Sequence, residues 1–149
     1  MGELMTEEFI LNFPAVLQSK IRAGEFSFPE NTKFTYETIS AYRCIFSQEE
    51  QRQITREDFR SYAELGKKPK RGQVFDVNKP DYYGVSLFTS KEELYVKMNL
   101  PRKGVLIALG NIYQEGGPQW TNGGHICWWL YENADVSSFQ YVTEVKKSE

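Results

Sequence analysis

The hydrophobic positions have a helical spacing near the start of the chain. The apolar residues of this stretch recur every four residues: Phe9, Phe13, Leu17 and Ile21. Residues at this spacing share one face of a helix, Pro14 suits a helix start or kink, and Gly24 suits a helix end. The pattern predicts one or two amphipathic helices over residues 7–23, whose apolar stripe docks on a sheet.

Later in the chain the apolar residues form runs of strand length. The predicted strands cover residues 39–46, 83–89, 105–113, 125–131 and 139–145. Two helices are predicted between them, at 56–65 after the capping-box sequence Thr55–Asp58, and at 91–99 before Pro101. The Gly- and Pro-containing stretches 66–82 and 114–124 are predicted to be a long polar connection and a flexible hairpin loop.

These elements indicate an α+β protein of one domain over residues 1–149. A helical segment, 1–35, is expected to pack on a strand-rich body, 36–149, with a mixed or antiparallel sheet. The oligomeric state is left open by the sequence.

Charge and cysteine content narrow the classes of partner. Eighteen basic and twenty acidic residues argue against a general nucleic-acid binder. The basic run within residues 67–71 has two interpretations, a solvated loop or a local phosphate contact. Cys44 and Cys127 are too few for a disulfide framework, and both are expected to be reduced. No apolar run is long enough to span a bilayer, and a cytoplasmic protein without membrane association is expected.

The segment Gly123–Glu132 contains the candidate catalytic residue His125, which is the chain's single histidine. Strand alternation places His125, Cys127 and Trp129 on one face, and the apolar residues Ile126, Trp128 and Leu130 on the other, which should be core. His125 is then expected to be half exposed beside a pocket. A structural and a catalytic histidine both fit this position, and one histidine with two separated cysteines predicts no metal site.

Three segments in chain order carry a family resemblance: Tyr42-Arg43 on an early strand, Gly84-Val85-Ser86-Leu87-Phe88-Thr89-Ser90 on a middle strand before a helix, and Val105-Leu106-Ile107-Ala108-Leu109 on a later strand. This order resembles the arginine–serine–glutamate class of ADP-ribosyltransferases, in which an arginine, a Ser-Thr-Ser strand and a catalytic glutamate follow one another. The resemblance covers residues 39–145. It implies an ADP-ribosyltransferase-like fold and NAD as the cofactor.

The resemblance also implies roles for individual residues. Arg43 would clamp the diphosphate of NAD, because an arginine fork binds phosphate by paired hydrogen bonds. Ser86, Thr89 and Ser90 correspond to the serine motif and would bind the cofactor, with Ser90 orienting the glutamate or the ribose. Tyr113 and Trp120 would stack on nicotinamide or adenine. Plain alternatives stay open: Arg43 could pair with a carboxylate, Ser90 could cap the following helix, and the aromatic residues could belong to the core.

The expected glutamate is missing at its place in the chain. The residue at the start of the late strand is His125, which cannot provide a fixed negative charge for an oxocarbenium-like centre. Glu132 at the other end of that strand and Glu115 in the preceding loop are the other catalytic candidates. Two hypotheses follow: an NAD-dependent ADP-ribosyltransferase-like protein that modifies a macromolecule in a bacterial or phage conflict system, or a non-enzymatic inhibitor or adaptor that binds a protein through an aromatic surface around Trp120.

Overall fold

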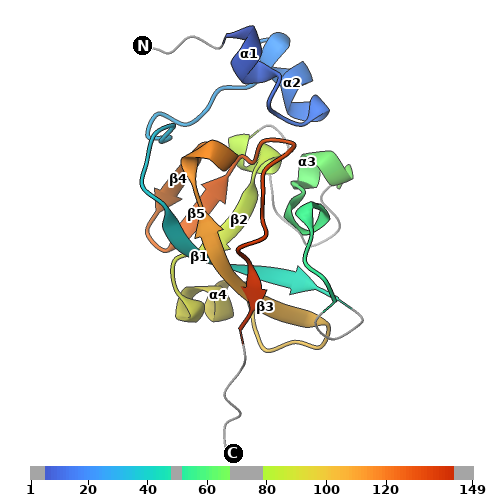
Figure 1. Cartoon of the computed structure of the whole chain (residues 1–149), viewed down its shortest axis with the longest axis vertical. Helices are drawn as coiled ribbons and strands as arrows, with labels where there is room; N and C mark the ends of the chain where they lie inside the picture. The colour runs from blue at the N-terminus through green and yellow to red at the C-terminus, as the bar shows by residue number, and fades with distance from the viewer. Residues whose placement is uncertain (1–5, 48–51, 68–78, 143–149) are drawn as a thin grey trace, which may run out of the picture.

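A single six-stranded antiparallel sheet forms the centre of the protein (Figure 1). The computed structural model describes residues 6–47, 52–67 and 79–142. The strands are β1 (Ile39–Phe46), β2 (Val85–Phe88), β3 (Val105–Ile112), β4 (Gln119–Asn122), β5 (His125–Trp128) and β6 (Gln140–Tyr141), and their order across the sheet is β4-β5-β2-β1-β3-β6. The predicted α+β class is therefore confirmed, and every strand pair is antiparallel.

The longest pairing joins β1 to β3. All eight residues of β1 have a partner, from Ile39 opposite Ile112 to Phe46 opposite Val105. The bounds of β1 are those predicted from its apolar run. β2 and then β5 extend the sheet on the other side of β1, so that Ser86 of β2 lies opposite Cys127 of β5.

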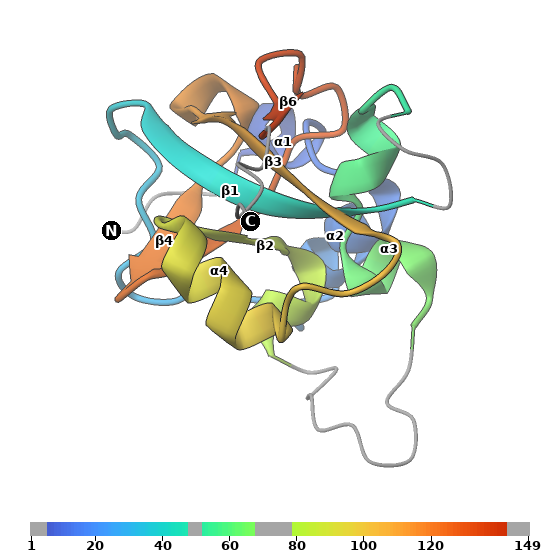
Figure 2. The ribbon, with the colours of Figure 1, turned by 90° about the horizontal axis from the view of Figure 1, so that it is seen from below.

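Both faces of the sheet are covered, and we name them after the two tryptophans that they bury. On the Trp128 face, β-strand residues such as Ile45, Leu87 and Ile126 pack with Phe59 and Phe139. On the Trp129 face, Phe88 and neighbouring strand residues pack against Leu94 of α4 (Lys91–Met98), which lies along this side of the sheet in Figure 2. The two-face pattern predicted for residues 125–130 is confirmed.

The N-terminal stripe docks on the Trp129 face, as predicted. The chain forms two helices here, α1 (Glu7–Ile10) and α2 (Ala15–Arg22), with Pro14 directly before the second. Phe13 and Leu17 are buried against Cys127 and Trp129. The backbone N–H of Glu132 donates to the carbonyl of Asn12 at 2.7 Å, which fixes the helices to the segment after β5.

The prediction of one helix over residues 56–65 is wrong. The chain forms a 3₁₀ turn, η1 (Arg56–Phe59), and a separate helix, α3 (Tyr62–Leu65). Each starts with its own capping box, and Arg60 between them is extended. The second capping signal, at Ser61, starts a new helix because an N-cap residue takes a non-helical backbone conformation.

The prediction that residues 114–124 form only a flexible loop is also wrong. This stretch contains the 3₁₀ turn η3 (Gln114–Gly116) and the edge strand β4, which pairs with β5 through a tight turn at Gly123. The polar sequence of β4 has no apolar alternation, and tertiary pairing determines its conformation. Other predicted elements extend beyond the observed bounds by a few residues, and the predictions for residues 68–78 and 143–145 fall outside the described residues.

Short turns complete the described part of the chain. The 3₁₀ turn η2 (Pro80–Tyr83) leads into β2, and the indole of Trp129 donates to the carbonyl of Pro80 at 3.0 Å. No helix in the described residues has the length and apolar character needed to cross a membrane.

Gly117 provides a test of this arrangement. Its φ is +137°, and a Cβ added there would lie 2.1 Å from the carbonyl oxygen of Trp129. Gly117→Ala is expected to lower the free energy of unfolding by about 3 kcal/mol or more, because backbone atoms cannot move aside as a flexible side chain can. The measurement is urea unfolding followed by tryptophan fluorescence.

Gly123→Ala is the matched control for this substitution. Gly123 also has a positive φ, of +65°, but nothing lies within 4 Å of an added Cβ. We expect a loss of only about 1 kcal/mol from backbone strain. Equal losses in the two variants would contradict the close packing of Gly117 against Trp129.

Candidate functional site

The sheet brings Ser86 and His125 into direct contact. Ser86 and His125 project from neighbouring strands on the Trp129 face, and Ser86 Oγ lies 2.9 Å from His125 Nε2. The Ser86 residue is exposed and His125 is half-buried. The Phe88 ring lies beside the imidazole, with 5.4 Å between ring centroids, and restricts its orientation.

The surroundings of His125 favour a neutral imidazole. Burial lowers the pKa of His125, the negative charge of Asp81 raises this pKa, and the positive charge of Lys97 lowers it further. A neutral imidazole protonated on Nδ1 can accept the Ser86 hydroxyl proton at Nε2. The pair therefore has the groups needed for proton transfer at an exposed hydroxyl.

Cys127 follows His125 on the same face but is not a comparable nucleophile. The residue is buried, and Cys44 is buried and unpaired as well, in agreement with the expectation of two reduced cysteines. Burial raises the pKa of the Cys127 thiol, so the thiol stays protonated at neutral pH.

Thr89 and Ser90 lie at the same end of the β2–β5 pair. The backbone N–H of Thr89 donates to the carbonyl of Gly124 at 3.0 Å, which joins the end of β2 to the start of β5. Ser90 is the N-cap of α4, and its hydroxyl accepts from the N–H of Glu93 at 3.1 Å. The capping interpretation of Ser90 is thus confirmed. We call Ser86, Thr89, Ser90 and His125 the β2–β5 site.

Arg43 lies on the other face of the sheet, and its side chain is hydrogen-bonded to backbone carbonyls. Nε and Nη2 donate to the carbonyl of Asp58 at 3.2 and 2.9 Å, and Nη1 donates to the carbonyl of Ser86 at 2.9 Å. The guanidinium lies over the Phe59 ring, and burial lowers the pKa of Arg43 to about 10. In this structure Arg43 holds η1 against β1 and β2, so it reaches the β2–β5 site only through the Ser86 backbone.

Trp120 is half-buried on β4, opposite Cys127. It packs against the cluster that contains Phe13 and Trp129. Trp120 is therefore near the β2–β5 site through strand pairing, and part of its ring belongs to the core.

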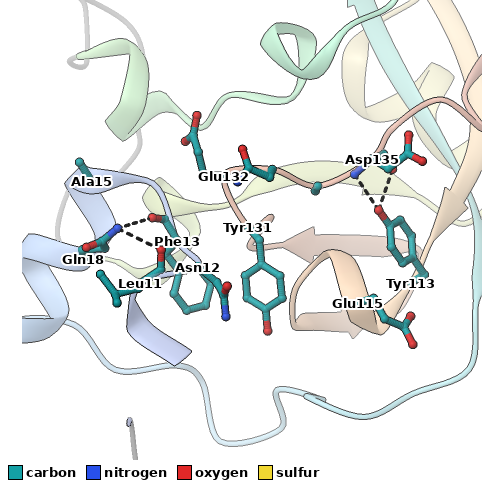
Figure 3. Close-up of a pocket in the computed structure, with 12 residues that line it drawn as sticks. Leu11, Asn12, Phe13, Ala15, Gln18, Tyr113, Glu115, Tyr131, Glu132 and Asp135 are labelled. Atoms are coloured by element: carbon teal, nitrogen blue, oxygen red, sulfur yellow. Dashed lines mark hydrogen bonds between the residues drawn. The ribbon is translucent and has the colours of Figure 1, made fainter. Parts of the chain in front are cut away.

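The remaining three candidates line a different feature, a groove of about 680 Å³ between the N-terminal helices and the chain after β5 (Figure 3). We call it the Tyr131 groove. Its residues include Leu11, Gln18, Tyr113, Glu115, Tyr131, Glu132 and Asp135. The Tyr113 hydroxyl donates to the carbonyl of Asp135 at 2.8 Å and accepts from its N–H at 2.7 Å.

The carboxylate of Glu132 in this groove is already paired. It accepts from Arg60 at 2.9 and 3.1 Å, and Arg60 holds the pKa of Glu132 below its usual range. Glu115 is exposed at the groove. The structure thus divides the predicted site residues: it brings Ser86, Thr89, Ser90 and His125 together and places Tyr113, Glu115 and Glu132 elsewhere.

The sequence patterns did not predict a ligand-binding or catalytic role for three charged residues near the β2–β5 site: Asp81, Glu93 and Lys97. Asp81 and Lys97 act on His125 through their charges. Glu93 belongs to the Ser90-x-x-Glu93 capping motif, which was the only sequence signal for it. Among the described residues no group of three His, Cys, Asp or Glu side chains could hold a metal ion.

Comparisons with known proteins yield no relative. No protein-family model, curated protein or solved structure matches the chain.

The single histidine allows a direct test of the electrostatics. In an NMR titration the pKa of His125 is expected below about 6.5, the ordinary value for histidine. Asp81→Asn should lower this pKa further and Lys97→Gln should raise it. A pKa above 6.5, or one that neither substitution moves, would contradict the described surroundings.

The same shift has a consequence for stability. Because the folded pKa lies below the unfolded value, the unfolded chain binds the proton first as the pH falls. The stabilisation from a neutral His125 is fully present above about pH 6.5 and declines as the pH falls through the folded pKa. Urea unfolding between neutral and acid pH should show a smaller decline for His125→Gln than for the wild type.

Proposed function

We propose that the protein binds NAD or a related nucleotide at the β2–β5 site and acts as an ADP-ribosyltransferase-like enzyme on a macromolecule. The observation that carries this proposal is the 2.9 Å contact between Ser86 Oγ and His125 Nε2. Ser86 belongs to a segment that carries the family resemblance, His125 stands where the family has its glutamate, and the two come from neighbouring strands.

The chemistry of the pair supports a transfer reaction. Cleavage of the nicotinamide–ribose bond generates an oxocarbenium-like centre, and the attacking hydroxyl or amine must lose a proton. A neutral His125 can accept that proton and does not repel the positive centre. The exposed Ser86 hydroxyl can donate to the substrate or to the imidazole.

Other groups would hold the nucleotide. Arg43 would act as a positioning residue, since its Nη1 fixes the carbonyl of Ser86. The charge of Lys97, which acts on His125, would contact a phosphate group, and Thr89 and Ser90 at the end of β2 would lie beside the ribose. A role in a bacterial or phage conflict system belongs to this proposal through the family resemblance alone.

Titration with NAD tests the proposal. We expect a saturable change in tryptophan fluorescence, because Trp120 pairs with β5 beside the site. Ser86→Ala should weaken binding about tenfold, which corresponds to one hydrogen bond of roughly 1.4 kcal/mol. Ser40→Ala, an exposed serine on β1, is the control and should leave the affinity unchanged. No saturable response in the wild type would refute the proposal.

The second candidate function is a non-enzymatic protein-binding module, and the Tyr131 groove favours it. The groove combines the aromatic rings of Tyr113 and Tyr131 with the carboxylates of Glu115 and Asp135. Leu11, which also lines the groove, is exposed to solvent. This surface suits a basic segment of a partner protein, because carboxylates attract cationic side chains and tyrosines provide contact area.

Charge reversal distinguishes this candidate. Glu115→Lys should weaken binding of a lysine-rich peptide with apolar flanks about tenfold, and the affinity of the wild type should fall with salt. Glu92→Lys on α4 has the same charge change outside the groove and serves as control. Equal effects in both variants, measured by fluorescence anisotropy of the labelled peptide, would count against the groove.

A further inference from the structure

Two neighbouring cavities of opposite character meet where the loop after α4 enters β3. The first has a volume of about 200 Å³, and its lining comes from α4, the loop, β3 and the segment around β6, including Leu100, Val105, Ile107 and Val142. None of the described residues that line it carries a charge. The second has a volume of about 450 Å³, and its lining includes Phe46, Arg102 and Lys103. Val105 lines both. We call them the apolar cavity and the basic cavity.

A tight turn holds the two cations beside the apolar cavity. The N–H of Val105 donates to the carbonyl of Arg102 at 3.3 Å, and Gly104, the third residue of this turn, has a φ of +81°. Glycine suits this place because a type II turn requires a positive φ there. The N–H of Ser47 donates to the carbonyl of Gly104 at 2.9 Å, which fixes the turn to the end of β1 (Figure 2). Arg102 and Lys103 are therefore exposed on a well-held turn.

Phe46 adds exposed apolar area to this charged surface. It lies opposite Val105 in the β1–β3 pair, so the two side chains project from the same face of the sheet. Phe46 is 54% exposed. Within the described ranges Arg102 and Lys103 have no ion pair with a carboxylate. The surface thus combines apolar groups with positive charge that no described carboxylate neutralises.

The size and charge of the two cavities indicate the kind of ligand. An apolar cavity of about 150 Å³ can hold benzene, so the apolar cavity has room for one large apolar side chain. Arg102 and Lys103 next to it attract carboxylates. An extended peptide advances only about 3.3 Å per residue, so an apolar residue and the acidic residues beside it can reach both cavities together.

Two other negatively charged partners fit this surface less well. Recognition of anionic lipid uses clusters of about four to eight Lys and Arg residues, and nucleic-acid binding neutralises several phosphates. The basic cavity has two cations, Arg102 and Lys103, and the chain has a net charge of −2. A short acidic segment requires no more positive charge than this.

We infer that the apolar and basic cavities together bind an acidic segment of a partner protein, with one phenylalanine or leucine side chain in the apolar cavity and carboxylates at Arg102 and Lys103. The two cavities share no lining residue with the Tyr131 groove and contain no residue of the β2–β5 site. The inference therefore goes beyond the proposed function and depends neither on NAD nor on a basic partner segment.

Peptide binding tests the charged half of the surface. The probes are short fluorescein-labelled peptides, each with one phenylalanine or leucine among aspartates and glutamates, and the full chain is titrated against them by fluorescence anisotropy. Arg102→Gln and Lys103→Gln should each weaken binding about threefold, and the double variant about tenfold. Added salt should weaken binding to the wild type. The control is Lys33→Gln, an exposed lysine beside β4 at the opposite edge of the sheet, which should leave the affinity unchanged.

The apolar half is tested from both partners. A probe whose phenylalanine or leucine is replaced by alanine should bind about tenfold more weakly, because it lacks the side chain that the cavity buries. Val105→Phe, which fills the apolar cavity and keeps both cations, should weaken binding of the original probe to the same extent. The alanine probe should bind this variant and the wild type equally, since neither complex has a ligand side chain in the cavity. Thermal unfolding shows whether Val105→Phe remains folded.

Several results would overturn the inference. They include no saturable binding of any probe, an equal loss of affinity in Lys33→Gln and Lys103→Gln, or equal binding of the alanine and original probes. Binding to phosphatidylserine vesicles that the double variant loses, without peptide binding, makes the surface a membrane site. A dimer of the wild type that the double variant abolishes makes it a contact between two copies. The NAD titration of the double variant should match the wild type, so this inference and the proposed function fail independently.

Discussion

The structure depends on a short segment that is buried on both sides, Ile126–Leu130. All five residues are at most 4% exposed, and the two tryptophans point to opposite faces of the sheet. Each indole N–H still has an acceptor, the carbonyl of Gly117 for Trp128 and that of Pro80 for Trp129. Burial of so much apolar area requires a cover on each face, which explains why η1 and the N-terminal helices pack where they do.

The candidate site lies where this buried segment reaches solvent. His125 is the first residue of β5 and follows the Gly123-Gly124 turn. The residue is half-buried, and its ring contacts Phe88. Partial burial keeps the imidazole neutral, and the strand register places it against the exposed Ser86 hydroxyl. The contact between Ser86 and His125 is thus a consequence of the same packing that stabilises the core.

A network of polar groups on the Trp128 face supports the position of Ser86 from the other side of the sheet. Arg43 uses three nitrogens to bind the carbonyls of Asp58 and Ser86, and Asp58 in turn caps η1 and pairs with Arg52. A buried guanidinium needs such partners, because an unpaired charge in the interior is costly. The network therefore holds β2 and η1 in fixed relation and supports Ser86 through its backbone.

Local sequence patterns were enough to predict four features with strong local signals: the β1 run, the stripe of Phe13 and Leu17, the alternating faces of β5 and the capping of α4 by Ser90. Period and capping report local conformation, so these features could be predicted without a partner segment. Four other features follow from the three-dimensional fold: β4 is a strand, Arg43 binds backbone carbonyls, Glu132 pairs with Arg60 and Glu93 lies over Gly124. Each of these depends on contacts between segments far apart in the chain, about which local patterns contain no information.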